Sequence, residues 1–220
     1  MSKALDTDAA QGTFYTIGKT GHGEYEEKKS RFLGEAIPVK NPQEASAELE
    51  RIRKQHYDAR HHCSAYVPGN RRDIKKASDD GEPSGTAGLP ILKVIESRQC
   101  TNVIVVVTRS FGGTLLGTGG LTRAYTAASR LALEDAGPVC MRSGEILELQ
   151  MEYSLLNPVR HYLEKEAIQT LGMEYTDHVV CRIAVPQPRV KSVRAFLQTL
   201  SGGTMGVRTV ESGFYGFENV

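Results

Sequence analysis

Two stretches of the sequence decide its fold, Asp79–Gly88 (DDGEPSGTAG) and Val103–Arg123 (VIVVVTRSFGGTLLGTGGLTR). Val103–Val107 is an uninterrupted run of β-branched residues, which predicts a central strand buried on both faces. Eight of the 22 glycines fall in the two stretches, where they permit tight turns and close approach to another molecule. Two such loops in one domain predict a binding surface.

The residues around these loops predict a mixture of strands and helices. Asn41 as N-cap, Pro42 at the first helical position and Glu44 three residues after the cap form a helix start. The apolar spacing that follows makes this helix amphipathic. The other expected elements are extended chain at Glu24–Lys40, a strand at His62–Val67 with a basic hairpin partner near 71–76, and helices at Pro90–Glu96 and Leu121–Leu133.

The segment Ala136–Gly144 contains Gly, Pro and Ser between two periodic regions and predicts a domain boundary, with domains at residues 1–138 and 139–220. Beyond it, the order β-α-β-β-α-β predicts a ferredoxin-like split βαβ domain, so the fold class is α+β. The expected strands are Leu147–Tyr153, Met173–Thr176, Val179–Val185 and Met205–Val210, and the expected helices are Asn157–Leu171 and Pro188–Leu200.

Composition excludes several classes of protein. The net charge is +1, so any nucleic-acid contact must be local. The four cysteines stand 37, 40 and 41 residues apart without a Cys-x-x-Cys pair, so the sequence encodes neither a zinc site nor a redox motif. The N-terminus is polar and no apolar run is long enough to span a membrane, which indicates a cytoplasmic protein.

The second glycine stretch has the pattern of an anion site. Gly117, Gly119 and Gly120 lead from a strand into a helix, where unpaired amides and the helix dipole favour negative charge. Arg109 ends the strand and Arg123 lies in the first turn, so a phosphate is the natural ligand. Alternatively, the glycines serve only turns and packing. Neither a Walker loop nor a Rossmann fingerprint is present.

The charged residues near these loops allow two interpretations each. Asp79, Asp80 and Glu82 are able to coordinate Mg²⁺, or to cap the following turn and helix through backbone amides. Lys28, Lys29 and Arg31 form a basic cluster that either meets phosphates or is a solvated charge run.

A Cys/His nucleophile is a weaker hypothesis. His62 and Cys63 are adjacent in a strand and therefore point to opposite faces. Cys63 is better explained as a small core residue. His61 is on the same face as Cys63, which leaves a place near the first loop open to it as an alternative.

Five segments resemble the IMPACT family, in its bacterial YigZ-like branch. They are Lys29–Phe32, His61–Tyr66, Ser78–Leu92, Val107–Gly113 and Leu116–Tyr125. The resemblance covers about residues 20 to 135, and the split βαβ region matches the second domain of that branch by pattern only.

This resemblance implies that the first domain has the fold of the second domain of a small-subunit ribosomal protein and of domain IV of elongation factor G. The second domain is expected to resemble domain V of that factor, and the family implies a role around translation and RNA. Ser110 stands where the family commonly has Tyr, and His62 where it commonly has Asn. If the missing aromatic stacks on a base, Phe111 is the remaining candidate.

We therefore expect a non-enzymatic protein that binds RNA or a ribosome, with no catalytic residue, metal or cofactor. A small-molecule phosphotransferase or hydrolase that uses the same loops is one alternative, and a protein-interaction module is another. The residues expected to contact nucleic-acid phosphate are Arg31, Arg109, Gly112, Gly113, Gly117, Gly119, Gly120 and Arg123. The residues expected to order the neighbouring loop, or to hold a metal in the alternative, are Asp79, Asp80, Glu82, Ser84 and Thr86.

Overall fold

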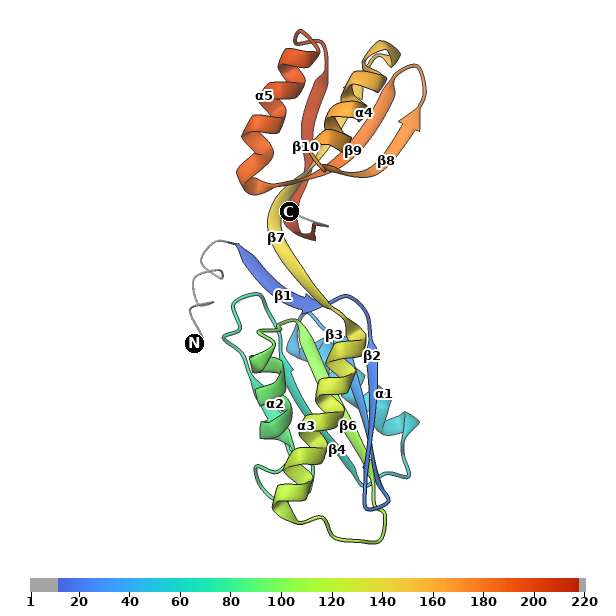
Figure 1. The fold of residues 1–220 in the computed structure, drawn as a ribbon, viewed down its shortest axis with the longest axis vertical. Helices are drawn as coiled ribbons and strands as arrows, with labels where there is room; N and C mark the ends of the chain where they lie inside the picture. Colours follow the sequence, from blue (N-terminus) through green and yellow to red (C-terminus); the bar gives the residue numbers. More distant parts are fainter. Residues whose placement is uncertain (1–11, 218–220) are drawn as a thin grey trace. The chain divides into compact units, whose positions relative to one another are not determined.

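The computed structural model describes residues 12–217, and the chain divides into two compact units. Among the described residues, the N-terminal unit is Phe14–Val139, and the C-terminal unit begins at Cys140. Both units combine helices with an antiparallel sheet (Figure 1), so the protein is an α+β protein of two domains. Among the described residues, no helix is long and apolar enough to cross a membrane.

The sheet of the N-terminal unit has β6 at its centre, as the β-branched run predicts. The strand order is β2-β3-β6-β4-β5, and all of these neighbours pair antiparallel. The bounds of these strands are β2 Gly21–Glu27, β3 Ser30–Pro38, β4 His61–Val67, β5 Lys76–Ser78 and β6 Val103–Ser110, while β1 (Thr13–Ile17) precedes them in the chain and is not a strand of this sheet. The basic segment after β4 thus supplies only a short hairpin partner.

The segment Glu24–Lys40, which the sequence predicts as one extended stretch, contains a hairpin turn. Glu27 pairs with Ser30, so Lys28 and Lys29 form a two-residue loop between β2 and β3. Both lysines have positive φ angles, 49° and 65°. Such angles are unusual outside Gly, Asn and Asp, which is why the turn carries no sequence signal.

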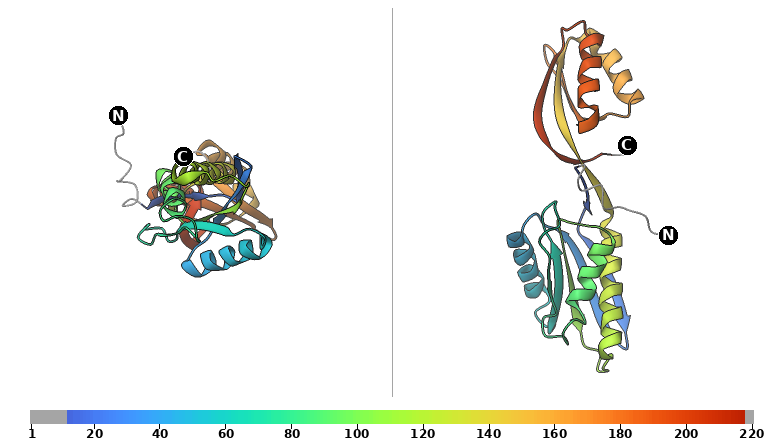
Figure 2. Two further views of the ribbon diagram at one scale, coloured as in Figure 1. Left: turned by 90° about the horizontal axis from the view of Figure 1, so that it is seen from below. Right: turned by 90° about the vertical axis from the view of Figure 1, so that its left-hand side faces the viewer.

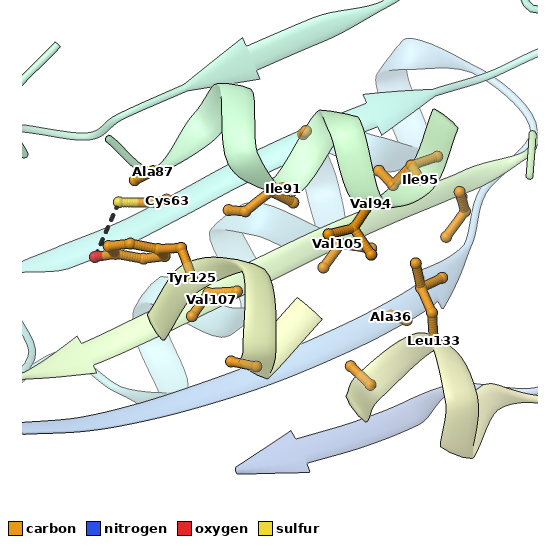
Figure 3. Packing of buried hydrophobic residues seen from close by; sticks show 14 of the residues in the cluster. Ala36, Cys63, Ala87, Ile91, Val94, Ile95, Val105, Val107, Tyr125 and Leu133 are labelled. Carbon is orange, nitrogen blue, oxygen red and sulfur yellow. Dashed lines mark hydrogen bonds between the residues drawn. The ribbon is translucent and has the colours of Figure 1, made fainter. Parts of the chain in front are cut away.

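Helices cover both faces of this sheet, which explains the unbroken apolar run of β6. Val103, Val105 and Val107 belong to a core formed with α2 (Gly88–Ser97) and α3 (Gly117–Ala136), part of which is drawn in Figure 3. Ile104 and Val106 belong to a second core formed with α1 (Pro42–Gln55). Figure 2 shows α1 on one side of the sheet and the other two helices on the opposite side.

The first helix begins where its sequence predicts. The Asn41 side-chain oxygen accepts a hydrogen bond from the Glu44 amide at 2.8 Å. The Glu44 carboxylate reaches back to accept from the Lys40 amide at 2.7 Å. The first contact satisfies an amide that the first helical turn leaves unpaired, and the second ties the preceding residue to the helix.

Helix α3 begins at Gly117 rather than at Leu121, so the glycines expected in a loop form its first turn. The helix lies very close to the sheet because glycines face it from the strands. A Cβ on Gly21 would lie 2.2 Å from the Ala136 nitrogen, and one on Gly34 would lie 2.6 Å from the Ala128 carbonyl oxygen. Side chains at these two positions would push the helix away.

The C-terminal unit has the predicted element order β-α-β-β-α-β. Its strands lie in the order β10-β7-β9-β8 and pair antiparallel, so β9 separates β7 from β8. The bounds are β7 Pro138–Met151, α4 Leu156–Lys165, β8 Gln169–Tyr175, β9 Val179–Pro186, α5 Val190–Leu200 and β10 Gly206–Gly216, with short 3₁₀ turns at Tyr153–Leu155 and Gln187–Arg189.

The predicted helix Asn157–Leu171 is too long at its C-terminal end. Helix α4 ends at Lys165, and Gln169 already begins β8. Ala167, between them, has a φ angle of 49°, which reverses the chain without the glycine that usually marks a helix end.

Candidate functional site

A pocket of about 890 Å³ opens in the N-terminal unit where β6 ends and α3 begins. Besides the end of β6, it is lined by the chain between α1 and β4, the β6–α3 loop, the start of α3, and the loop between β5 and α2 (residues 79–87), which we call the acidic loop. Its lining residues are Asp58, Ala59, Arg60, His61, Glu82, Pro83, Arg109, Ser110, Phe111, Leu115, Leu116, Gly117, Thr118 and Leu121. Both stretches that the sequence singles out therefore meet at one cavity.

Arg109 lies inside this site rather than on the surface. Its Nη1 donates to Glu82 Oε1 at 2.7 Å, and only 7% and 3% of the two side chains are exposed. The Tyr125 hydroxyl donates to the same Glu82 oxygen at 2.8 Å. The carboxylate thus receives two hydrogen bonds, which a buried charge requires. Sequence reasoning missed Tyr125, although a tyrosine on an apolar helix face needs a partner for its hydroxyl.

The Arg109 guanidinium also contacts two aromatic rings. Its central carbon lies 5.6 Å from the ring centres of both Phe32 and Phe111. Phe32 is fully buried, whereas Phe111 is 58% exposed. The buried Arg109 Nε has no hydrogen-bond partner in the described part of the chain. One donor of a pocket-lining arginine is therefore left unsatisfied.

Cys63 closes the inner end of this network. Its Sγ lies 2.9 Å from the Asp79 carbonyl oxygen and 3.3 Å from the Tyr125 hydroxyl (Figure 3). Burial raises the pKa of the Cys63 thiol to about 12 and also raises the pKa of Tyr125. Because the thiolate is the reactive form, Cys63 is a structural residue and not a nucleophile.

Asp79 caps the start of helix α2, although it lies nine residues before Gly88 in the sequence. Its two carboxylate oxygens accept from the amides of Gly85 at 2.8 Å, Ala87 at 3.0 Å and Gly88 at 2.8 Å. The N-cap residue Ala87 has no side-chain acceptor of its own, so Asp79 supplies the cap. Burial acts to raise the pKa of Asp79, but the three amide contacts outweigh it and the pKa is lowered.

Asp80 and Thr86 of the acidic loop also bind protein groups. Asp80 accepts from the His62 amide at 2.7 Å and from Arg53 Nη2 at 2.9 Å. The Thr86 hydroxyl donates to the Pro83 carbonyl at 2.6 Å, and Ser84 is exposed. Within residues 12–217, no group of three or more His, Cys, Asp or Glu side chains is placed to hold a metal ion.

The start of α3 is open to solvent. Gly117, Thr118 and Gly119 are exposed, the N-cap residue Leu116 offers no side-chain acceptor, and the first turn contains no acidic residue. The Arg123 side chain is 69% exposed and contacts Glu27 Oε1 through Nη2 at 3.4 Å. Its Nη1 would lie 3.7 Å from a Cβ built on Gly119. Exposed residues of a helix start, whose amides lack partners within the helix, and a guanidinium thus lie together.

Gly112, Gly113 and Gly120 have different structural roles. A Cβ on Gly112 would lie 2.0 Å from the Lys29 carbonyl carbon, and its amide donates to the Ser30 hydroxyl at 3.1 Å. Gly113 has a φ angle of 86° and open space around it, while a Cβ on Gly120 would lie 2.9 Å from the Leu116 Cβ. Gly112 therefore holds the β6–α3 loop against the Lys28–Lys29 turn.

Arg31 lies on β3 beside this turn. Its Nε and Nη2 donate to the two Glu24 carboxylate oxygens at 2.5 and 2.9 Å, with about half of each side chain exposed. Among the three predicted arginines, Arg31 and Arg123 are therefore accessible to a large ligand, and Arg109 is accessible only from the pocket.

Comparisons with known proteins match both units. The Impact N-terminal domain matches residues 28–133, and a domain of unknown function (DUF1949) matches residues 149–204. The IMPACT family member YvyE of Bacillus subtilis is 34% identical over 90% of this chain and 92% of its own length. The IMPACT family member YigZ of Escherichia coli is 36% identical over 84% of this chain and 91% of its own length.

A solved structure agrees with these matches. A crystal structure described as that of a hypothetical protein is 33% identical to this chain, covers 91% of it and 98% of its own chain, and superposes with a TM-score of 0.59. The chain belongs to the IMPACT family, as a YigZ- and YvyE-like member with an Impact N-terminal domain followed by a DUF1949 domain.

Proposed function

We propose that this protein binds RNA through the end of its N-terminal unit at which α3 begins. The observation that supports this proposal best is the start of α3, where Gly117, Thr118 and Gly119 are exposed and the Arg123 guanidinium lies beside Gly119. The amides of a first helical turn have no partners within the helix. Backbone amides at a helix start and arginine side chains are the groups that proteins most often use to contact phosphates.

Neighbouring charges extend this surface along the β2–β3 hairpin. Lys28 and Lys29 are exposed at the turn, and Arg31 follows them on β3. Gly112 keeps the turn and the β6–α3 loop in direct contact. Figure 1 shows both loops at the lower end of this unit. A nucleic-acid backbone lying on α3 would therefore have several cations within reach.

We extend the proposal to a role around translation, on the basis of the fold. In this proposal the N-terminal unit has the fold shared by the second domain of a small-subunit ribosomal protein and domain IV of elongation factor G. The C-terminal unit is a ferredoxin-like domain resembling domain V of that factor, which fits its strand order β10-β7-β9-β8. We propose ribosomal or ribosome-associated RNA as the partner and the cytoplasm as the location.

The phosphotransferase alternative has less support. It requires a carboxylate free to hold a metal or to act as a base. Asp79 accepts three backbone amides, and Asp80 is bound to the His62 amide and to Arg53.

Salt-dependent RNA binding tests the proposal. The Arg123→Ala variant removes one phosphate contact, so the slope of log affinity against log salt should become shallower by about one unit. Arg130→Ala is the matched control, because Arg130 lies on the same helix with a 58% exposed side chain but away from its start. If the wild-type protein binds RNA without salt dependence, or does not bind it, the proposal is wrong.

A further inference from the structure

The pocket and the exposed start of α3 are parts of one site. Gly117 and Thr118 line the pocket and also belong to the first turn of the helix. A phosphate bound to their amides would lie at the mouth of a cavity of about 890 Å³. Cavities of roughly 300–1,000 Å³ are typical of sites for small organic groups, which a phosphate alone would not fill.

Apolar side chains form a large part of the pocket lining. Phe111 is 58% exposed and Leu115 is 82% exposed, and Leu116, Leu121 and Pro83 complete the apolar lining. When more than half of a large apolar side chain beside a cavity is exposed, the side chain indicates a surface for a ligand rather than part of the hydrophobic core.

Polar groups lie beside this apolar surface. The Arg109 Nε is buried, lacks a hydrogen-bond partner among residues 12–217, and belongs to a side chain that lines the pocket. A buried donor without an acceptor costs free energy, and it leaves Arg109 as a strained polar member of the pocket wall. His61 and Ser110 add further hydrogen-bonding groups to the lining.

We propose that this pocket receives one unpaired nucleotide of the bound RNA, with its base stacked on Phe111 and its phosphate at the start of α3. The inference rests on the proposed function and narrows the ligand from RNA in general to RNA with an extruded or terminal nucleotide. The bases of a continuous duplex are paired and stacked, and only an unpaired base is free to enter a cavity.

Phe111 is placed to act as the stacking platform. The Arg109 guanidinium lies 5.6 Å from its ring centre, and Arg109 is fixed in turn by Glu82. The buried Arg109 side chain thus supports the exposed ring of Phe111. Stacking on such a ring is tolerant of base identity, because every base has a π-face.

The test uses three RNA hairpins of one sequence: fully paired, with a single bulged 2-aminopurine nucleotide, and with an abasic bulge. The abasic bulge has the same flexibility and phosphate as the 2-aminopurine bulge and lacks only the base. We expect the base-containing bulge to bind on the order of tenfold more tightly than the abasic bulge. Its fluorescence should fall on binding, because the base leaves solvent and stacks on a ring.

Two variants test whether the preference for the base arises at Phe111. Phe111→Ala should remove both the preference for the base and the fluorescence change, and folding should be retained because the ring is largely exposed. Phe196→Ala is the matched control, since it removes an aromatic ring, 43% exposed, on α5 in the other unit, and it should keep both effects.

The outcomes separate the two proposals. If all three hairpins bind equally and with salt dependence, the protein binds RNA but the pocket takes no base. The inference about the pocket is then wrong, while the proposed function stands. The inference is also wrong, and the proposed function again stands, if Phe111→Ala keeps the preference for the base. If no hairpin binds, the proposed function and the inference fall together.

Discussion

Arg109 and Glu82 form an ion pair whose two side chains are almost completely buried, with Nη1 and Oε1 2.7 Å apart. The pair joins the end of β6 to the acidic loop, 27 residues earlier in the chain. It also places the Arg109 guanidinium against Phe111 at the pocket. The stability of the loop and the geometry of the pocket therefore depend on the same contact.

Removal of one member of this pair should destabilise the N-terminal unit strongly. Glu82→Ala leaves the Arg109 charge buried without a counter-ion and the Tyr125 hydroxyl without its acceptor. The expected loss in the free energy of unfolding is about 3–5 kcal/mol. Urea unfolding followed by far-UV circular dichroism, with the two units fitted as separate transitions, measures it.

Two further variants control for this measurement. Glu24→Ala breaks the exposed pair with Arg31 and should change stability far less. The double variant Glu82→Ala/Arg109→Ala should lose less than the sum of the two single losses, because it leaves no unpaired charge. Strict additivity would show that the pair contributes nothing as a pair.

Asp79 should give the N-terminal unit a measurable dependence on acid pH. Its carboxylate caps α2 through three amides, and Asp79→Ala should cost about 1–2 kcal/mol in the free energy of unfolding. The pKa of Asp79 is lowered in the folded protein. Its contribution is therefore complete above the unfolded-state pKa of about 3.9 and is lost as the pH falls through the folded-state value.

The Asp79→Asn variant isolates this titration, because it keeps one acceptor oxygen and cannot ionise. The stability difference between wild type and Asp79→Asn should be constant near neutral pH and should shrink below about pH 4. A difference that stays constant throughout the acid range would mean that the charge of Asp79 does not stabilise the cap.

The sequence predicts those parts of the fold that local patterns determine. The start of α1 follows from Asn41 and Glu44, whose contacts lie within four residues of one another. The central place of β6 follows from its unbroken β-branched run, since only a strand covered on both faces buries every residue. Local rules fail at α3, because glycine disfavours helices and the first turn of α3 nevertheless contains three of them.

The candidate site is less predictable, because its contacts join distant parts of the chain. The sequence places Arg109 beside glycines and so suggests that it contacts phosphate, without showing how deeply it is buried. Glu82 and Tyr125, which lie close to Arg109 only in the folded chain, instead fix it inside the pocket. Similarly, the three backbone partners of Asp79 depend on how its loop folds over the start of α2.

Gly112 and Gly113 should respond very differently to the same substitution. In Gly112→Ala the new Cβ would overlap the Lys29 carbonyl carbon, a backbone atom that cannot move aside alone. The expected loss is about 3 kcal/mol or more in the free energy of unfolding. Gly113→Ala meets no atom within 4 Å and incurs only the strain of a positive φ angle, about 1–2 kcal/mol.

Urea unfolding of both variants measures this contrast, and RNA binding adds a second comparison. If Gly113 serves only the turn, Gly113→Ala should keep the salt dependence of RNA binding. Equal destabilisation by the two substitutions would contradict the close backbone contact between the β6–α3 loop and the Lys28–Lys29 turn.

Substitution of the Lys28–Lys29 turn should increase the stability of the protein and weaken its RNA binding. Both lysines have positive φ angles, the φ signs of a type I′ hairpin turn, for which Asn-Gly is the favoured pair. Lys28→Asn/Lys29→Gly should therefore raise the free energy of unfolding by about 1–2 kcal/mol. It should also weaken RNA binding and make the salt slope shallower by up to about two units, because two exposed charges are lost. If the variant gains stability and binds RNA with an unchanged salt slope, the two lysines are not part of the RNA interface. The interface would then consist mainly of the start of α3 and Arg123.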